Sequence, residues 1–227
     1  MRLIPVIRCL AAVAILVSLT GCQTTRQTRS VEITGFLGDY SQLRDGGWGE
    51  AQLLYIDESA DFSRYDAVWI ESVEIWVSER TEKLSKEDAQ QITDYAYAAF
   101  HEELSEHFRI AQGSAPGVLR LRAAVSEAKG ARVLGNAVTS IVPQARAAAT
   151  LLGTASDVQV FVGRASIEME LTDSVSGERL AAVVDERAGT KAIRGGILKW
   201  SDVKLAFDHW AKRTRERMLE YGVRTKG

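Results

Sequence analysis

Two alternating runs joined by a short turn place the strongest constraint on the fold of this chain. In residues 165–171, apolar side chains alternate with a serine and two glutamates, and residues 179–187 run back after a turn at 173–178. A period of two is typical of a strand that buries one face, and a turn rich in Asp, Ser and Gly joins antiparallel strands. The sequence therefore predicts a β-hairpin, and with it a sheet.

Two earlier segments also predict strands. Residues 67–77 are rich in β-branched and aromatic side chains, and their alternation slips around Glu71 and Ser72, as it does at a β-bulge. In residues 119–125, leucine, alanine and valine alternate with arginines, which predicts a strand with one face in water.

Apolar residues at helical spacing predict two helices. The first runs from about Lys86 to Phe108 with Ser85 as its N-cap. The second starts after Trp200 with Ser201 as its N-cap, and it carries one apolar stripe opposite a charged face. Buried stripes of this kind indicate that both helices pack on the sheet.

The segment 130–156 interrupts this pattern. It has no acidic residue, and Arg132 and Arg146 are its only charged side chains, while Pro143 breaks or kinks any helix that it forms. One interpretation is one or two short amphipathic helices packed on the sheet. The other is a segment that contacts a membrane or inserts with copies of itself. Neither half is long enough to span a bilayer as a helix.

The expected order of elements is therefore β-α-β, a helical insert, then β-β-α. This order predicts an α/β (α+β) fold, with a mixed sheet of about four to five strands covered by helices. We expect a single domain at 35–227, preceded by a polar segment at 22–34 without periodicity that acts as a flexible tether.

The first 21 residues have the features of a signal peptide. Arg2 and Arg8 give a positive start, residues 9–19 form an apolar run too short for a permanent membrane span, and Leu-Thr-Gly precedes Cys22. This ending resembles a bacterial lipobox, in which the cysteine thiol is acylated and the preceding segment removed. Cys22 is therefore the predicted lipidation site, and the membrane is the first predicted partner.

The lipobox resemblance also predicts a location. Aspartate after the acylated cysteine marks retention in the inner membrane in the lipoprotein pattern, whereas this chain has Gln23. We therefore expect a lipid-anchored protein of the outer membrane whose domain faces the periplasm.

Composition limits the classes of function. Removal of the first 21 residues takes away Arg2, Arg8 and Cys9, so the mature chain is more acidic than the formal net charge of −2 and has Cys22 as its only cysteine. A weakly acidic domain without a basic cluster argues against nucleic acid as a partner. With its one thiol acylated, the domain has no disulfide and no cysteine-based metal site.

The sequence contains no nucleophile elbow, phosphate-binding glycine loop, dinucleotide fingerprint or zinc-protease motif. We therefore predict no catalytic residue, no cofactor and no metal. His101 and His107 stand six apart on the expected first helix, which places them on different faces, and His209 lies on the last helix. This spacing is a weak signal for a metal site.

Other polar and aromatic residues allow functional hypotheses. The carboxylates on or beside the hairpin suggest either solvated turn and strand-face residues, or a functional carboxylate pair or calcium site: Asp173, Glu178, Asp185 and Glu186. Trp69, Trp76 and Trp210 fall in core-like patterns, whereas Trp48 and Trp200 lie near loops and are candidate contact residues.

The chain resembles the bacterial lipoprotein family called domain of unknown function (DUF) 3313. The matching features are the lipobox ending at Cys22, Gly35 to Ser41 (GFLGDYS) followed by Leu43, Tyr65 to Ile70 (YDAVWI) and Glu168 to Glu178 (EMELTDSVSGE). The resemblance covers nearly all of the mature chain but implies no activity and no catalytic residue. The order of elements is also similar to periplasmic domains of Tol-type and curli-channel-type lipoproteins, which does not define a function.

Three functional hypotheses follow. The first is a non-enzymatic, lipid-anchored envelope protein whose periplasmic domain binds another envelope protein or itself. The second is a self-assembling secretion or export pore in which residues 130–156 contact the membrane. The third is a hydrolase of unfamiliar type with polar groups near the 173–186 hairpin.

Overall fold

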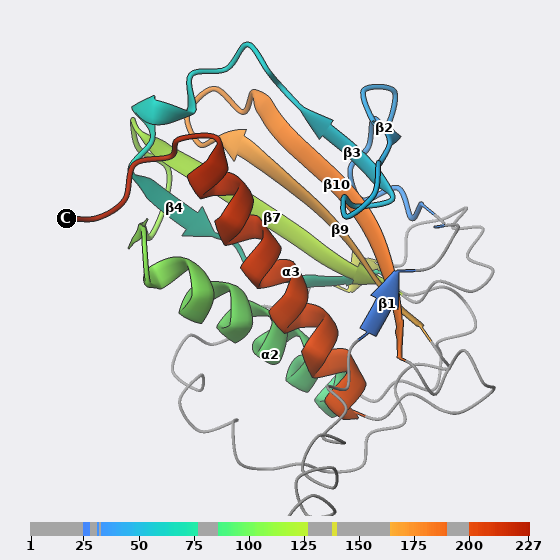
Figure 1. Cartoon of the computed structure of the whole chain (residues 1–227). Helices are drawn as coiled ribbons and strands as arrows, with labels where there is room; N and C mark the ends of the chain where they lie inside the picture. The colour runs from blue at the N-terminus through green and yellow to red at the C-terminus, as the bar shows by residue number, and fades with distance from the viewer. Residues whose placement is uncertain are drawn as a thin grey trace, which may run out of the picture.

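Two helices lie side by side on one face of a mixed β-sheet (Figure 1). The computed structural model describes residues 25–27, 31, 33–76, 86–126, 138–139, 164–189 and 200–227. Its elements, in chain order, are β1 (Thr25–Gln27), β2 (Arg44–Asp45), β3 (Leu53–Ile56), the 3-10 helix η2 (Phe62–Arg64), β4 (Ala67–Ile70), β5 (Glu74–Trp76), α2 (Lys86–Ser105), β6 (Arg109–Ile110), β7 (Val118–Ser126), β8 (Val138–Thr139), β9 (Arg164–Asp173), β10 (Arg179–Gly189) and α3 (Trp200–Glu220).

The sheet has the strand order β2-β3-β10-β9-β7-β4-β6, with β1 also paired to β10 and β5 paired to β7 and β8. Pairing is antiparallel from β2 to β7 and parallel between β7, β4 and β6. The predicted mixed α/β class and the predicted hairpin, β9–β10, are therefore confirmed. The strand number is larger than predicted, since ten strands pair within the described residues and several are only two residues long.

The strand predicted at 67–77 is divided into β4 and β5. Ile70 pairs with Leu121 and Glu74 with Ala124, so three residues on this side oppose two residues of β7. One extra residue in a strand is the definition of a β-bulge. The slip in alternation at Glu71 and Ser72 therefore marks a real break in the ladder.

Both predicted helices are present, with different ends. α2 ends at Ser105 rather than at Phe108, because the chain turns at Leu104, whose carbonyl accepts the Phe108 amide at 2.9 Å, and then pairs with β4 as β6. α3 begins at Trp200, so Ser201 lies in its first turn instead of at the N-cap. Ser85 lies outside the described residues.

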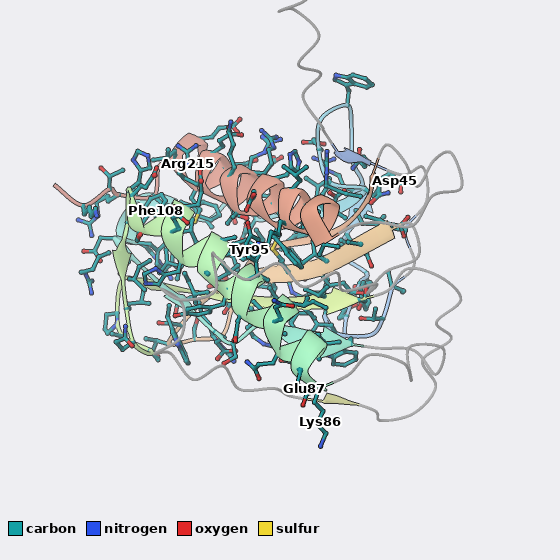
Figure 2. The ribbon with its side chains drawn as sticks, turned by 90° about the horizontal axis from the view of Figure 1, so that it is seen from below. Asp45, Lys86, Glu87, Tyr95, Phe108 and Arg215 are labelled. Atoms are coloured by element: carbon teal, nitrogen blue, oxygen red, sulfur yellow. The ribbon has the colours of Figure 1, made fainter. Side chains whose placement is uncertain are left out.

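The main core lies between the helices and the sheet. Ile92, Ala96, Phe100 and Leu104 recur every four residues along α2 and are fully buried, as is Phe207 on α3. Polar contacts join the outer edges of the two helices. Figure 2 shows Tyr95 between α2 and α3, where its hydroxyl donates to Asp208 at 2.9 Å, and Arg215 donates to Glu103 at 2.6 Å.

The other face of the sheet is covered by the segment before β2. Phe36 and Leu37 are buried against Ala182 and Val184 of β10 in a second apolar cluster. The face expected to be in water is therefore partly covered, and the side chain of Arg122 is only 26% exposed. The alternation of apolar and polar side chains correctly predicted that the two faces of the sheet differ. It did not predict that the segment before β2 packs on the polar face.

Two other expectations concern segments that the structure describes only in part. Within 130–156 it describes Val138–Thr139, which form β8 antiparallel to β5, so a strand stands there in place of the expected helix. The rest of that segment lies outside the described residues. Within the expected tether, Thr25–Gln27 pair with β10 as β1, a strand that the sequence pattern did not predict.

Candidate functional site

An apolar groove lies between α3 and the strands at the β3 side of the sheet. Its volume is about 670 Å³, within the range of roughly 300–1,000 Å³ typical of small-molecule sites. One wall is α3, the floor is formed by β3, β10 and β9, and the loop between β2 and β3 stands at the mouth. α2 packs farther along the sheet, against β4, β5 and β6, and leaves this part of the face to α3 alone.

Strand register assembles the floor of the groove. Ala181 and Val183 of β10 lie on one face because side chains alternate along a strand, and they pair with Ile56 and Leu54 of β3. On the other side they pair with Leu171 and Met169 of β9. Ala181, Val183 and Ile56 are only half-buried, so the groove leaves apolar surface in contact with solvent.

The wall of the groove comes from one stripe of α3. Trp210, Thr214, Met218 and Tyr221 follow at intervals of three or four residues and all line the groove. Trp210 and Met218 are buried, whereas Tyr221, just past the helix end, is exposed. The stripe predicted from the sequence is therefore present, and its last part faces the groove instead of a closed core.

A buried carboxylate lies at the polar end of the groove. Asp185 is 4% exposed and accepts hydrogen bonds from Trp210 Nε1 at 2.7 Å and Gln27 Nε2 at 2.8 Å. Burial raises the pKa of Asp185, and the two hydrogen bonds oppose this effect in part. β1 thus contributes directly to the site through Gln27.

A neutral histidine stands beside this carboxylate. Arg187 Nη1 lies 2.9 Å from His209 Nε2, which accepts the arginine proton, and 3.9 Å from Asp185 Oδ2. Burial, followed by the positive charges of Arg187 and Arg213, lowers the pKa of His209 to about 4. The charged groups at this end of the groove therefore contact one another, and the imidazole is uncharged at neutral pH.

The pKa of His209 predicts a pH dependence of stability. An unfolded histidine titrates near 6.5, so between pH 6.5 and about 4 the unfolded chain binds a proton that the folded chain does not bind. Lowering the pH from 7 to 5 should therefore destabilise the wild-type protein more than His209→Gln in urea unfolding. His101→Gln, at an exposed position on α2, should keep the wild-type dependence. Equal pH dependence of wild type and His209→Gln would contradict the assignment.

The hairpin carboxylates do not form a pair. Asp185 and Glu186 are consecutive and point to opposite faces of β10, while Glu178 is exposed in the turn. Asp173 is 9% exposed and accepts hydrogen bonds from Arg64, Tyr65 and the amides of Val175 and Ser176, at 2.8 to 2.9 Å. The expectation of solvated residues is therefore wrong for Asp173, Asp185 and Glu186, because each is buried by neighbouring elements.

Burial alone would raise the pKa of the Asp173 carboxyl. The hydrogen bonds from Ser176, Tyr65 and Val175, together with Arg64, outweigh it and hold that pKa well below its usual range. The Asp173 carboxylate therefore stabilises the turn after β9 and joins it to Arg64 at the end of η2 and to Tyr65, the next residue.

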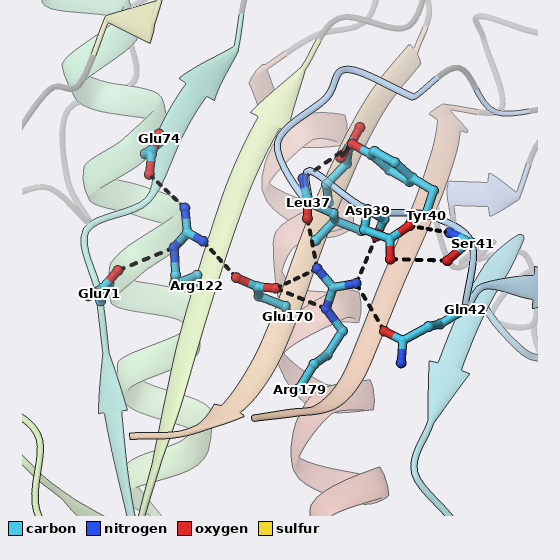
Figure 3. Close-up of polar contacts among 11 residues, drawn as sticks. Leu37, Asp39, Tyr40, Ser41, Gln42, Glu71, Glu74, Arg122, Glu170 and Arg179 are labelled. Atoms are coloured by element: carbon cyan, nitrogen blue, oxygen red, sulfur yellow. Dashed lines mark hydrogen bonds and ion pairs between the residues drawn. The ribbon is translucent and has the colours of Figure 1, made fainter. Parts of the chain in front are cut away.

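A network of charged side chains lies on the opposite face of the sheet (Figure 3). Glu170 accepts from Arg122 at 2.6 Å and from Arg179 at 3.2 Å, and Arg122 also lies 3.5 Å from Glu71 and 3.7 Å from Glu74. Every charge in this group therefore has an opposite charge beside it. Sequence patterns gave no signal for this network beyond the alternation of Arg and Glu on β7 and β9.

The network also holds the segment before β2. Arg179 donates to the carbonyls of Leu37 and Asp39, both at 2.7 Å, and the fully buried Glu168 accepts from the Thr34 amide and the Tyr40 hydroxyl. Burial, followed by the contact with Glu168, raises the pKa of Tyr40. The network therefore fastens this segment to the sheet.

The remaining predicted residues are distributed as follows. His107 lies past the end of α2, so it does not share the helix of His101 as expected, and it lies 3.4 Å from Arg215. Trp210 is buried, Trp69 and Trp76 are half-buried, and Trp48 is fully exposed at the mouth of the groove. Cys22 lies outside the described residues, and the side chain of Trp200 is not among those described.

Among the described residues, no three or more His, Cys, Asp or Glu side chains are grouped so as to hold a metal ion. In the same part of the chain, no helix has the length and apolar character needed to cross a membrane.

The protein is therefore an α/β domain with a mixed sheet, and an apolar groove large enough for a small molecule lies beside its C-terminal helix, α3. The chain belongs to the family described as "Protein of unknown function (DUF3313)", which matches residues 32–214. This match confirms the resemblance found in the sequence. No curated protein matches the chain at a significant level.

The solved structures that match the chain are distant in both sequence and structure. A variant PelC dodecamer from Paraburkholderia phytofirmans is 15% identical, with a TM-score of 0.37, and the match covers 71% of this chain and 95% of that one. A DUF4136 family protein from Bacteroides thetaiotaomicron is 14% identical, with a TM-score of 0.34, covering 74% of this chain and 95% of that one. Likeness at this level assigns no function.

Proposed function

We propose that this protein is a lipid-anchored, non-enzymatic component of the cell envelope, attached through Cys22 to the outer membrane with its domain in the periplasm. Its role is to bind an apolar or amphipathic envelope molecule in the groove beside α3. The lipobox at residues 19–22 supports the anchor. The observation that carries the binding role is the groove itself, with a volume of about 670 Å³.

The chemistry of the groove favours binding over catalysis. Its floor is apolar, and its polar end consists of groups that satisfy one another: Asp185 accepts from Trp210 and Gln27, and His209 accepts from Arg187. Apolar walls with a few polar groups are typical of sites that bind and orient a molecule. Arg213 and Arg217 also line the groove. Each is ion-paired with a glutamate of α3, Glu216 at 2.7 Å and Glu220 at 2.8 Å, and an anionic headgroup would compete for or share these guanidinium groups.

A groove-filling variant tests this proposal. We expect dodecanoate, which joins an aliphatic chain to one anionic group, to bind the wild-type protein with a negative heat-capacity change in titration calorimetry. Val183→Trp, on the half-buried floor, should weaken binding by at least about tenfold, or ~1.4 kcal/mol. The matched control is Val175→Trp at an exposed turn position outside the groove. Equal binding by both variants would refute the groove as the binding site.

A further inference from the structure

The loop between β2 and β3 presents a fully exposed tryptophan. Trp48 has no part of its side chain shielded by the described residues, although an indole is among the largest apolar groups of a protein. Two glycines precede it and one follows, so no neighbouring side chain covers the ring. Tryptophan is enriched at interfaces where one part of the ring is apolar and the other is wet, so this side chain is a candidate contact residue.

Hydrogen bonds fix this loop. The Gly46 amide donates to the Gln52 carbonyl at 2.8 Å, Gln27 Nε2 to the Glu50 carbonyl at 2.7 Å, and Arg213 Nη2 to the Gly49 carbonyl at 3.1 Å. A Cβ at Gly46 would lie 1.8 Å from the Ala51 oxygen, so the tight approach of the two ends of the loop requires glycine there. The loop is therefore closed on itself and connected to β1 and to α3, which fixes the backbone that carries Trp48.

The same contacts join the loop to β1, a strand that follows Cys22 closely in the sequence. Gln27 belongs to β1, and Thr25, the first residue of that strand, is three residues after Cys22. Three residues span at most about 11 Å even when fully extended. Only this short stretch of chain joins Cys22 to β1. β1 contacts the Trp48 loop through Gln27.

We propose that Trp48 enters the interfacial region of the bilayer to which Cys22 is anchored, so that the groove opens toward the membrane surface. The inference rests on the proposed function, in which Cys22 is acylated. Tryptophan is enriched at membrane interfaces because its ring is apolar while its N–H remains in contact with water and headgroups. Trp48, Gly49 and Glu50 also line the groove, so an orientation that inserts the indole brings this part of the groove to the lipid.

Fluorescence quenching by brominated lipid tests the proposal. The full-length acylated protein is reconstituted in phosphatidylcholine vesicles with or without bromine on the acyl chains near the headgroup. The wild type, with five tryptophans, should lose emission in the brominated vesicles. Trp48→Phe should abolish that loss, whereas Trp69→Phe, at a half-buried position on β4, should retain it.

The possible failures are distinguishable. If the mass of the purified protein shows no acyl chains, the proposed lipid anchor at Cys22 is wrong. The proposed insertion of Trp48 into the bilayer is then refuted as well, because it depends on that anchor. If the protein is acylated but all three forms emit equally in both kinds of vesicle, the anchor stands and the Trp48 contact is refuted. Equal quenching of wild type and Trp48→Phe also refutes it, because another tryptophan then reports the membrane.

Discussion

Replacing Cys22 with serine is expected to abolish lipid incorporation completely. A hydroxyl does not replace the thiolate nucleophile that forms the thioether with the lipid. The variant should therefore remain an unprocessed precursor of 227 residues that retains its first 21. Labelling of cells with a clickable fatty acid, followed by the intact mass of the purified protein, measures both acylation and cleavage.

The chain provides a matched control for this experiment. Cys9 is its one other cysteine and lies within the apolar part of the signal segment. Cys9→Ser should keep normal acylation, because the modified residue is the one that follows Leu-Thr-Gly. A cleaved, soluble Cys22→Ser product would show instead that the segment is an ordinary secretory signal.

Replacing Arg179 with alanine is expected to destabilise the fold by about 3–5 kcal/mol, the cost typical of breaking a buried ion pair by removing one partner. The Arg179 side chain is 16% exposed, and its guanidinium contacts Glu170, the carbonyls of Leu37 and Asp39, and Gln42 (Figure 3). The variant leaves two carbonyl oxygens without this donor. Glu170, 9% exposed, keeps only its contact with Arg122.

Urea unfolding measures this effect, and Arg109→Ala is its control. Arg109 also forms a 2.8 Å ion pair, with Asp66, but the two side chains are 58% and 44% exposed. Exposed pairs contribute about 0–1 kcal/mol because water and salt screen them. Hydrogen exchange of residues 34–43 should also increase in Arg179→Ala. Loss of less than 1 kcal/mol would mean that the apolar contacts of Phe36 and Leu37 and the hydrogen bonds to Glu168 hold this segment without Arg179.

Long periodic patterns allowed the main elements to be predicted. α2 and α3 each extend over about 20 residues, and the strands of the β9–β10 hairpin over 10 and 11, so their periods of 3.6 and two are repeated several times. β2, β6 and β8 have two residues each, too few to show any period. They form because the edge of an existing strand offers backbone partners, which is a property of the assembled sheet.

The polar end of the groove could not be predicted. Gln27 and Asp185 are separated by 158 residues, and Arg187 and His209 by 22, yet each pair is in hydrogen-bond contact. In the sequence, Asp185 was a strand-face carboxylate and His209 an isolated histidine on a helix. Only the packing of α3 and β1 against β10 brings these four residues together. The resulting burial raises the pKa of Asp185 and lowers the pKa of His209.

The sequence by itself determined the hairpin, the two amphipathic helices and the family of this protein. The tertiary structure decided which surfaces remain in contact with water. Glu168 and Glu170 alternate with apolar residues as exposed side chains do, but both are buried: Glu168 contacts Thr34 and Tyr40, and Glu170 contacts Arg122 and Arg179. Val183 alternates as a core residue does, but it lines an open groove. The physical reason is that a period of two distinguishes the faces of a strand, whereas burial depends on what the rest of the chain places on each face.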